Sequence, residues 1–598
     1  MPERLVLHDA VNDEWLIFTE PVDLMQARGP GDVPGVLIEV ERRVNQEDLY
    51  AAGFVSYEAA SGFDPAYVTH KDPRLPLVCF GLFSGVRRCE ALERPEAGTE
   101  RPALWQMTGS RDRYVETLSA IKRQIELGNT YQINYTVRKK AIDISDPWGL
   151  FLGTAADAPY AAYIECDDHA IVSASPELFF RLNGEQLISK PMKGTARRGL
   201  TSSDDLDARR RLYESQKNRA ENVMIADMVR NDMGRIAVPG SVKVPRLFEI
   251  EKYPTVWQMT STVSARTTAP VAEVFRALFP CASVTGAPKV SSMAIIAGLE
   301  DSPREIYTGA IGFMAPNRQA RFNVAIRTAI VDTKTGEAVY GVGGGIVWDS
   351  DPDDEYRECL AKARILSTPD CGQEFELLET MLWTPDDGYF LIEKHLNRMR
   401  ASAGYFDFEF DQATIEKELA GIAKRLPRER HRIRLLLRRD GQIHSVEAPL
   451  LDADSDRPRR LVLAREPIDS SDPFLYHKTT RRDAYERAIQ DVGDADDVLL
   501  WNEDGYVTET GIANVIVRLD GELVTPPVEC GLLAGTYREL LLERGEVSER
   551  EIHLSELSGS TDLTLVNSVR GEYPARLSGP PIACLHGRDD RYHQDAVG

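Results

Sequence analysis

The stretch GVGGGIVWDSDPDDEYRECLAKARILSTPDCGQE, residues 341–374, contains the seam that divides this chain. Its glycine-rich start allows a ligand to approach the backbone closely. EYRECLAKARIL is rich in Ala, Leu and Arg and is predicted to be a helix. Pro369, Asp370 and Gly372 then interrupt the pattern before FELLETMLW begins a new one at Phe375. We therefore expect one domain over residues 1–366, a linker over 367–373 and a second domain over 374–598.

Both sides of the seam mix strands with helices. In the first half, residues 161–175 and 177–189 are predicted to be pairs of strands joined by Asp and Asn-Gly turns. Residues 205–234 are predicted to form one long helix. In the second half, residues 431–439 and 514–519 are predicted to be strands and residues 536–544 a helix. The expected fold class is α+β or α/β in both halves.

The composition is that of a soluble globular protein of 598 residues, 42% hydrophobic and 28% charged. With 71 basic and 94 acidic residues, the net charge is −23. This charge disfavours non-specific binding to nucleic acid or to an anionic membrane. An anionic small ligand would need positive charge that is gathered locally or supplied by a metal ion.

Cysteine usage and the start of the chain favour a cytoplasmic protein. The eight cysteines form no CxxC pair, so neither a zinc site nor a disulfide framework is expected. MPERLVLHDAVNDEW lacks the basic-then-apolar pattern of a signal peptide. The most apolar stretch, Leu77 to Val86, is too short to span a bilayer.

Two predicted helices of the first half carry glutamates in unusual places. Glu221 shares a helix face with the apolar residues at i+3, i+4 and i+7. A carboxylate on such a stripe must be paired or must hold a cation. The alternative to a cation is a buried pair with Arg219, Arg230 or Arg235. On the second helix, Glu358 and Lys362 share a face, a spacing that usually gives a solvated surface pair.

Two further clusters lie between these helices. Glu177 follows Pro176 at the start of an apolar, strand-like run. KPMKGTARRG, residues 190–199, places basic side chains around the turn Gly194–Thr195, and this arrangement suits a carboxylate ligand. The alternative is an ordinary basic loop.

These clusters belong to a longer series of motifs in one order. The series is YEAA at Tyr57, GNTYQINYT at 128–136, SPELFF, PMKGTARRG, RAENVMIADMVRNDMGR, SVTGAPK at 283–289, REIYTGAIG, FNVAIRT and GGGIVWDSDPDDEYRE. It resembles the chorismate-utilising enzyme family, which includes anthranilate, isochorismate and salicylate synthases. The resemblance covers nearly all of residues 1–366 and implies a large α/β sandwich with the active site between its two sheets.

The resemblance implies a role for each cluster. Glu221 and Glu358 match the family's magnesium ligands, and Mg²⁺ would bridge them to a carboxylate of chorismate. Glu177 matches the general acid that protonates the departing C4 hydroxyl. The family's substrate-binding positions are matched by Gly194, Thr195, Tyr307, Arg327, Gly343, Gly344, Gly345 and Lys362.

Lys193 indicates the branch of the family. Anthranilate synthases have Ala at this place, whereas PMKGT is similar to aminodeoxychorismate synthases. In those enzymes the lysine attacks C2 of chorismate as the C4 hydroxyl leaves, and ammonia then enters at C4 and displaces the lysine. Attack requires the neutral amine, so the site must lower the pKa of Lys193.

Two glutamines mark differences from relatives. Isochorismate and salicylate synthases have a lysine near Gln132 that activates water, and glutamine cannot act as that base. Many relatives have His where Gln258 stands, so Gln258 is assigned no chemical role. No Cys–His–Glu amidotransferase segment is found in the chain, and the expected ammonia source is a partner glutamine amidotransferase subunit.

The second half carries a lysine with the features of an electron-sink site. Lys478 lies in FLYHKTTRRDAY before a helix-like run, and Glu509 lies between strand-like segments in DGYVTETGIANVIV. Gly535 and Thr536 would present free backbone N–H groups to a phosphate. A lysine that forms imines, a carboxylate and a phosphate site together suit pyridoxal 5'-phosphate.

This second series resembles the class IV, fold-type IV pyridoxal-phosphate family. By resemblance Lys478 is the Schiff-base lysine and Glu509 the partner of the pyridinium nitrogen. The phosphate would be held by Arg398, Gly535, Thr536 and Ser568. The HKTT and NSVRG forms are most similar to aminodeoxychorismate lyases, and members of the family often form dimers, so a homodimer through this domain is one expectation.

The two halves predict consecutive reactions. Chorismate and ammonia would give 4-amino-4-deoxychorismate, and loss of pyruvate would give 4-aminobenzoate for folate synthesis. One alternative is an anthranilate synthase-like half fused to a branched-chain or D-amino acid aminotransferase. A second alternative is a C-terminal half that is a non-catalytic interaction module.

Overall fold

A computed structural model describes residues 4–93, 104–155, 158–363, 375–450, 457–490, 493–557 and 563–578. The chain forms two compact units. The first comprises Met1–Arg197 and Arg209–Gln373, and the second comprises Arg198–Ala208 and Glu374–Gly598. The expected linker over 367–373 lies outside the described residues.

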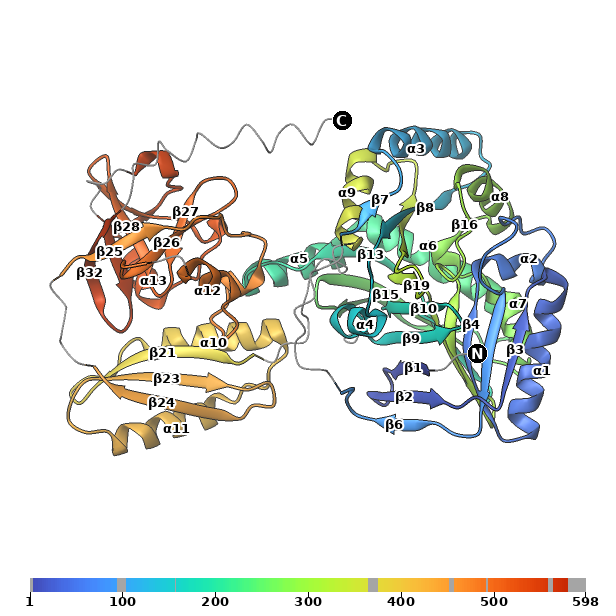
Figure 1. The fold of residues 1–598 in the computed structure, drawn as a ribbon, viewed down its shortest axis with the longest axis horizontal. Coiled ribbons are helices and arrows are strands. Elements are labelled where there is room, and N and C mark those ends of the chain that lie inside the picture. The colour runs from blue at the N-terminus through green and yellow to red at the C-terminus, as the bar shows by residue number, and fades with distance from the viewer. Residues whose placement is uncertain are drawn as a thin grey trace. The chain divides into compact units, whose positions relative to one another are not determined.

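The described part of the first unit contains two ten-stranded sheets whose paired strands are all antiparallel (Figure 1). The first sheet has the order β16 (Gly286–Ala287), β8 (Gln132–Ala141), β20 (Ala338–Ile346), β19 (Thr328–Asp332), β10 (His169–Ser175), β9 (Tyr160–Cys166), β1 (Arg4–Asp9), β2 (Glu14–Thr19) and β6 (Arg87–Cys89), with β7 (Gln106–Met107) beside β8. The second has the order β13 (Met192–Arg197), β15 (Val256–Arg266), β12 (Gln186–Lys190), β11 (Leu178–Asn183), β18 (Gln319–Val324), β17 (Ala310–Ala315), β4 (Tyr50–Val55), β5 (Val78–Phe83) and β3 (Asp23–Ala27), with β14 (Lys243–Lys252) beside β15.

The two sheets face each other across a shared core. Phe18 and Ile171 of the first sheet belong to the same buried cluster as Phe54 and Phe83 of the second. Helices α3 (Arg111–Glu126), α4 (Pro147–Thr154), α8 (Lys289–Leu299) and α9 (Pro352–Lys362) pack with the first sheet, and α1 (Val33–Gln46) and α7 (Val271–Leu278) with the second. The expected α/β sandwich is confirmed.

One helix prediction is wrong. Residues 205–234 do not form a single helix, because α5 (Ser202–Glu214) ends before Ser215 and α6 (Gln216–Gly234) begins after it. The Ser215 backbone is extended, and its hydroxyl accepts from the Asn218 N–H at the start of α6. Serine is favoured at this capping position because its side chain satisfies an N–H that the helix leaves free. The strand pairs predicted over 161–175 and 177–189 are confirmed as β9–β10 and β11–β12.

The second unit contains a four-stranded and an eight-stranded sheet in its described part. The smaller sheet has the order β22 (Gly388–Tyr389), β21 (Leu377–Thr384), β23 (His431–Leu437) and β24 (Ile443–Pro449). The larger has the order β27 (Val507–Thr510), β26 (Asp497–Trp501), β25 (Arg459–Leu463), β32 (Gly571–Leu577), β31 (Leu563–Asn567), β28 (Asn514–Leu519), β29 (Glu522–Thr525) and β30 (Ser548–Glu549). The unit also holds helices α10 (Ile392–Phe406), α11 (Gln412–Arg425), α12 (Asp483–Ile489) and α13 (Thr536–Glu543).

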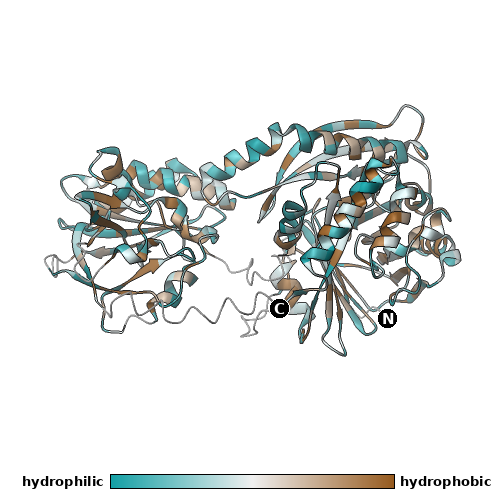
Figure 2. Cartoon of the chain, turned by 90° about the horizontal axis from the view of Figure 1, so that it is seen from above, coloured by the Kyte–Doolittle hydropathy of each residue, from teal (hydrophilic) through white to brown (hydrophobic). Residues whose placement is uncertain are grey.

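Hydrophobic residues concentrate on the interior strands of each unit, and the outward helix faces are mostly hydrophilic (Figure 2). Among the described residues, none of the helices combines the length and apolar character that crossing a membrane requires.

Candidate active sites in the two units

The glycine-rich strand β20 forms one wall of the candidate site in the first unit. It pairs with β8, which places Gly345 opposite Asn134. A Cβ atom at Gly345 would lie 2.6 Å from Lys193 Nζ and 2.5 Å from Gln132 Nε2. Any larger residue would therefore displace the lysine, because real Cβ atoms do not approach other atoms this closely.

Lys193 lies among charged groups from several elements. It is half-buried on β13, and burial lowers the pKa of its ammonium group. Glu221, Glu177 and Glu358 act in the opposite direction, and Lys362 adds to the lowering. Five predicted site residues are thus close enough to influence one another electrostatically.

Glu177 is a deeply buried carboxyl group, with 2% of its surface exposed. Burial raises its pKa to about 7, although the Ser283 hydroxyl donates to Oε1 over 2.7 Å and opposes this rise. A carboxyl with this pKa carries its proton in a large fraction of molecules near neutral pH. It can therefore donate that proton to a leaving group.

The two predicted metal ligands differ in their contacts, since within the described part of the chain Glu358 is paired and the Glu221 carboxylate is not. Glu221 is half-buried on α6, and its carboxylate makes no hydrogen bond or ion pair with the described residues. The alternative pair with an arginine is not formed: Arg230 pairs with Asp227, Arg219 lies over Phe248 and Arg235 contacts Tyr67. Glu358 on α9 pairs with Lys362 over 2.7 Å.

These two carboxylates fit a magnesium site in which the protein supplies only some of the ligands. Within the described residues there is no group of three or more His, Cys, Asp or Glu side chains that would hold a metal alone. Mg²⁺ is commonly bound through one or two carboxylates together with substrate oxygens and water. Lys362 Nζ, which also donates to the Gly343 carbonyl over 2.9 Å, would have to release Glu358 for such a site to form.

The Gly194–Thr195 turn is held in place by Gln258. Gly194 has φ +91°, a conformation that favours glycine, and its carbonyl accepts from Gln258 Nε2 over 2.8 Å. The Thr195 hydroxyl donates to Gln258 Oε1 over 2.9 Å. Gln258 therefore shapes the turn that follows Lys193, a structural role that the motif comparison did not predict.

Tyr307 lies at the other end of the glycine run, where its ring packs against Gly341. Gly345 is four positions after Gly341, which is about 13 Å along a strand. Arg327 is half-buried and has φ 51°. Burial lowers the pKa of its guanidinium group, and the nearby Tyr340 and Tyr253 oppose this lowering.

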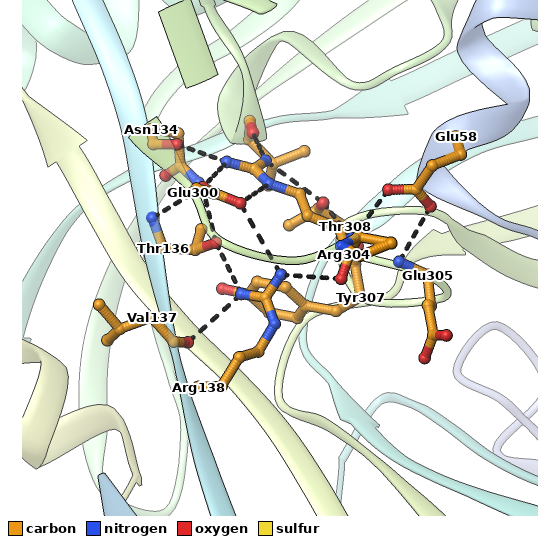
Figure 3. A network of polar contacts seen from close by, with 12 residues as sticks. Glu58, Asn134, Thr136, Val137, Arg138, Glu300, Arg304, Glu305, Tyr307 and Thr308 are labelled. Atoms are coloured by element: carbon orange, nitrogen blue, oxygen red, sulfur yellow. Dashed lines mark hydrogen bonds and ion pairs between the residues drawn. The ribbon is translucent and has the colours of Figure 1, made fainter. Parts of the chain in front are cut away.

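A buried polar network supports the loop that carries Tyr307 (Figure 3). Arg304 pairs with Glu300 over 2.6 Å and donates to the Asn134 carbonyl over 2.7 Å. Glu58 accepts the backbone N–H groups of Arg304 and Glu305. The network connects the loop to β8. Its only signal in the sequence was the i,i+4 pair of Glu300 and Arg304, a spacing that is also typical of ordinary surface pairs.

The second unit contains a cavity of about 450 Å³ lined by strands of both its sheets. All six predicted cofactor-binding residues line it, namely Arg398, Lys478, Glu509, Gly535, Thr536 and Ser568. Residues that the sequence did not single out also line it, among them Arg432, Arg434, Arg482, Tyr485, Asn514 and Arg570.

Burial shifts the pKa of both Lys478 and Glu509, and the shift of Lys478 favours the neutral amine that imine formation requires. Burial lowers the pKa of Lys478 to about 8, and Arg398 adds to the lowering. Burial raises the pKa of Glu509 to about 7. The Tyr485 hydroxyl and the Leu533 N–H donate to Glu509 Oε1 over 2.6 and 3.0 Å, which orients the carboxyl group at the cavity wall.

The predicted phosphate end of the cavity is built around a buried glutamate. Glu379 accepts from Arg398 Nε over 2.8 Å and lies 2.6 Å from His395 Nδ1. Burial acts to raise its pKa, but Arg398 and His395 outweigh this and lower it to about 2. Glu379 thus fixes Arg398 beside the start of α13, where no side chain caps Gly535. The sequence signal was a charged residue at a buried position of the FELLET strand.

These residues fit pyridoxal phosphate. Lys478 supplies an amine with a lowered pKa, Glu509 a carboxyl group for the ring nitrogen, and the N-terminus of α13 with Arg398 a place for a phosphate.

Two family models match this chain, one in each half. Residues 3–368 match the chorismate binding enzyme family, and residues 376–577 match the amino-transferase class IV family. The chain belongs to the chorismate binding enzyme family and carries a class IV amino-transferase domain after it.

Two curated relatives of the first half have similar names. Aminodeoxychorismate synthase of Streptomyces griseus is 39% identical over 304 residues, which cover 49% of this chain and 42% of that protein. Aminodeoxychorismate synthase component 1 of Salmonella typhimurium is 39% identical over 271 residues, which cover 45% of this chain and 59% of that protein. The matched region thus spans about two fifths to three fifths of these relatives.

Solved structures agree on the fold of the first unit. Anthranilate synthase component I from Streptococcus pneumoniae superposes with a TM-score of 0.52 at 21% identity, covering 62% of this chain and 93% of that one. A 2,3-dihydroxybenzoate-specific isochorismate synthase from Bacillus anthracis gives 0.51 at 20% identity, covering 61% and 95%.

Proposed function

We propose that the first half converts chorismate and ammonia to 4-amino-4-deoxychorismate. The observation that carries this proposal is the position of the Lys193 amine at Gly345, with Glu177, Glu221 and Glu358 around it. The similarity to proteins named aminodeoxychorismate synthase supports the same branch of the family.

In this reaction Lys193 acts as nucleophile and Glu177 as acid. The neutral amine forms a bond to C2 as the bond from C4 to its hydroxyl breaks, and Glu177 gives its proton so that water leaves. Ammonia then forms a bond to C4 as Lys193 departs from C2. The net change is chorismate plus ammonia to aminodeoxychorismate plus water.

The acidic ligands serve substrate binding. Magnesium, when bound, would offset the negative charge of a chorismate carboxylate. Glu221 and Glu358 would hold it, and Lys362 would be free to face the substrate once Glu358 turns away.

Gln132 favours ammonia over water as the incoming group. Its amide lies buried beside Lys193, and neither its oxygen nor its nitrogen has a partner among the described residues. An amide cannot remove a proton from water, whereas ammonia needs no such base. A glutamine amidotransferase subunit would supply the ammonia.

For the second half we infer a lyase that releases pyruvate and 4-aminobenzoate. Pyridoxal phosphate would supply an electron sink for the carbon that carries the amine. Lys478, with its lowered pKa, would remove the C4 proton, and Glu509 would hold the ring nitrogen. Pyruvate leaves as the ring becomes aromatic.

The charge of the cavity favours this substrate over a monocarboxylic amino acid. Arg432, Arg434, Arg482 and Arg570 line it in addition to Arg398. Aminodeoxychorismate carries two carboxylates, and guanidinium groups pair well with carboxylates. The 4-aminobenzoate so formed would enter folate synthesis.

The test is a product assay on the full chain with chorismate, ammonium and Mg²⁺, with and without pyridoxal phosphate. The proposal expects 4-aminobenzoate and pyruvate with both cofactors, and aminodeoxychorismate alone when pyridoxal phosphate is left out. Anthranilate as product would move the first half to another branch. Conversion that depends on an added amino acid would make the second half an aminotransferase, and failure to bind pyridoxal phosphate would make it a non-catalytic module.

A further inference from the structure

A short segment from the middle of the first sequence half belongs to the second structural unit. Arg198–Ala208 is grouped with Glu374–Gly598, although it lies between the β13 and α6 segments of the first unit. It follows directly after β13, the strand that carries Lys193. We call Arg198–Ala208 the strap.

The strap is folded on itself around Asp205, which is 4% exposed. Asp205 Oδ1 accepts from Arg198 Nε over 2.6 Å and from the Gly199 N–H over 3.0 Å. A Cβ atom at Gly199 would collide with the backbone of Asp204 and Asp205. These contacts define one compact conformation for the strap.

The strap packs against α10. Arg198 Nη2 donates to the Tyr405 carbonyl over 3.0 Å, and its guanidinium lies 4.3 Å from the centre of the Tyr405 ring. The Ser202 hydroxyl donates to the Ala401 carbonyl over 2.7 Å. Leu200 packs against the buried cluster that contains Leu475 and Tyr476.

The strap also binds His477, the neighbour of Lys478. His477 is 4% exposed, and burial lowers its pKa to about 4, so the ring is neutral. Its Nε2 lies 3.1 Å from the Leu200 carbonyl and its Nδ1 2.9 Å from the Ser402 hydroxyl. A carbonyl only accepts, so Nε2 carries the hydrogen and donates to Leu200, and Nδ1 accepts from Ser402.

Lys478 is therefore held from both directions along the chain. On the C-terminal side of Lys478, its carbonyl accepts from the Leu378 N–H over 2.9 Å, and the Thr480 N–H donates to the Glu376 carbonyl over 2.9 Å. On the N-terminal side of Lys478, the strap and Ser402 hold His477 in place through hydrogen bonds. A side chain placed for chemistry needs a backbone that is fixed in this way.

We propose that the strap is a positioning element for Lys478, through the hydrogen bond from His477 to the Leu200 carbonyl. The C-terminal half is then not a self-sufficient module, because part of the support for its lysine comes from residues 198–208. This proposal rests on the role proposed for Lys478. It makes Asp205, Arg198 and His477 positioning residues that touch no substrate.

The test compares variants of the full chain by hydrogen exchange without added cofactor. Asp205→Ala should increase the exchange rate of the Leu378 and Thr480 amides by about tenfold, because local opening becomes easier. Ser202→Ala removes one hydrogen bond and should give a smaller increase, about threefold. Ser203→Ala, at an exposed neighbour, is the matched control and should leave both amides unchanged.

Catalysis supplies the second readout. With supplied aminodeoxychorismate, Asp205→Ala should lower kcat while KM stays the same, and Asp205→Asn, which keeps an oxygen acceptor, should recover most of the loss. If the exchange rates in Asp205→Ala and Ser202→Ala equal those in Ser203→Ala, the strap does not position Lys478 and the proposal is wrong. If the proposed function fails instead, the wild-type chain gives no product while the exchange difference remains.

Discussion

Replacing Ser283 with alanine perturbs the proposed acid of the first reaction without altering its carboxyl group. The hydrogen bond from Ser283 to Glu177 favours the ionised form, so it holds the pKa below the value that burial alone would give. A hydrogen bond to a charged group contributes about 1.5 kcal/mol. At about 1.36 kcal/mol per unit, its loss should raise the pKa of Glu177 by roughly one unit.

The assay is the pH dependence of kcat for the first reaction at a fixed concentration of unprotonated ammonia. Activity requires protonated Glu177, so it falls as pH rises through the pKa of about 7. In Ser283→Ala this alkaline limb should move up by about one pH unit. Ser173→Ala is the matched control, because its buried hydroxyl bonds to Thr328 over 2.8 Å and not to Glu177. An alkaline limb that stays in place, or moves to lower pH, would refute the reasoning.

Three further predictions concern other buried groups. Burial raises the pKa of Glu58 from 4.5 to about 7, so its protonation stabilises the fold at low pH and that contribution is lost as pH rises through this window. Glu58→Gln replaces one of the two acceptor oxygens by an NH2 group, which adds a cost that does not depend on pH, so the prediction concerns the slope: from pH 5 to pH 8 the variant should lose less stability than the wild type, by at most about 3 kcal/mol in denaturant unfolding. Glu379→Ala leaves Arg398 without its partner and should weaken pyridoxal phosphate binding about a hundredfold in an absorbance titration; unchanged affinity would show that Glu379 does not position Arg398 for the phosphate. Gly345→Ala should displace Lys193 and lower the first reaction by at least about a hundredfold. Conversion of supplied aminodeoxychorismate by the same variant should be unaffected, and equal losses in both reactions would argue for general unfolding.

The sequence predicted the elements whose signals are local. Strand pairs with Asn-Gly turns were found because alternation and turn residues act over a few positions. The prediction of one helix over 205–234 was wrong at Ser215. Serine is also tolerated within a helix, so the residue type alone does not show the break. Its capping role depends on the extended backbone that it adopts in the folded chain.

The candidate sites were predictable where a motif keeps several groups together, and less so where support comes from distant segments. Lys193 and the glycine run were visible in the sequence, but Gln132 above Gly345 becomes apparent only when β8 pairs with β20. Glu379 and His477 act through groups that are far away along the chain. No spacing rule connects Leu200 to His477, since only tertiary packing brings them together.

In the proposed first reaction, Lys193 forms a covalent bond to the substrate. Mass spectrometry of peptides, after incubation of the full chain with chorismate and Mg²⁺ in the absence of ammonia, tests it most directly. We expect a chorismate-derived adduct on the peptide that contains Lys193, which disappears when ammonium is added and never forms in Lys193→Ala. A Lys193→Ala variant that still makes aminodeoxychorismate at the wild-type rate would contradict it.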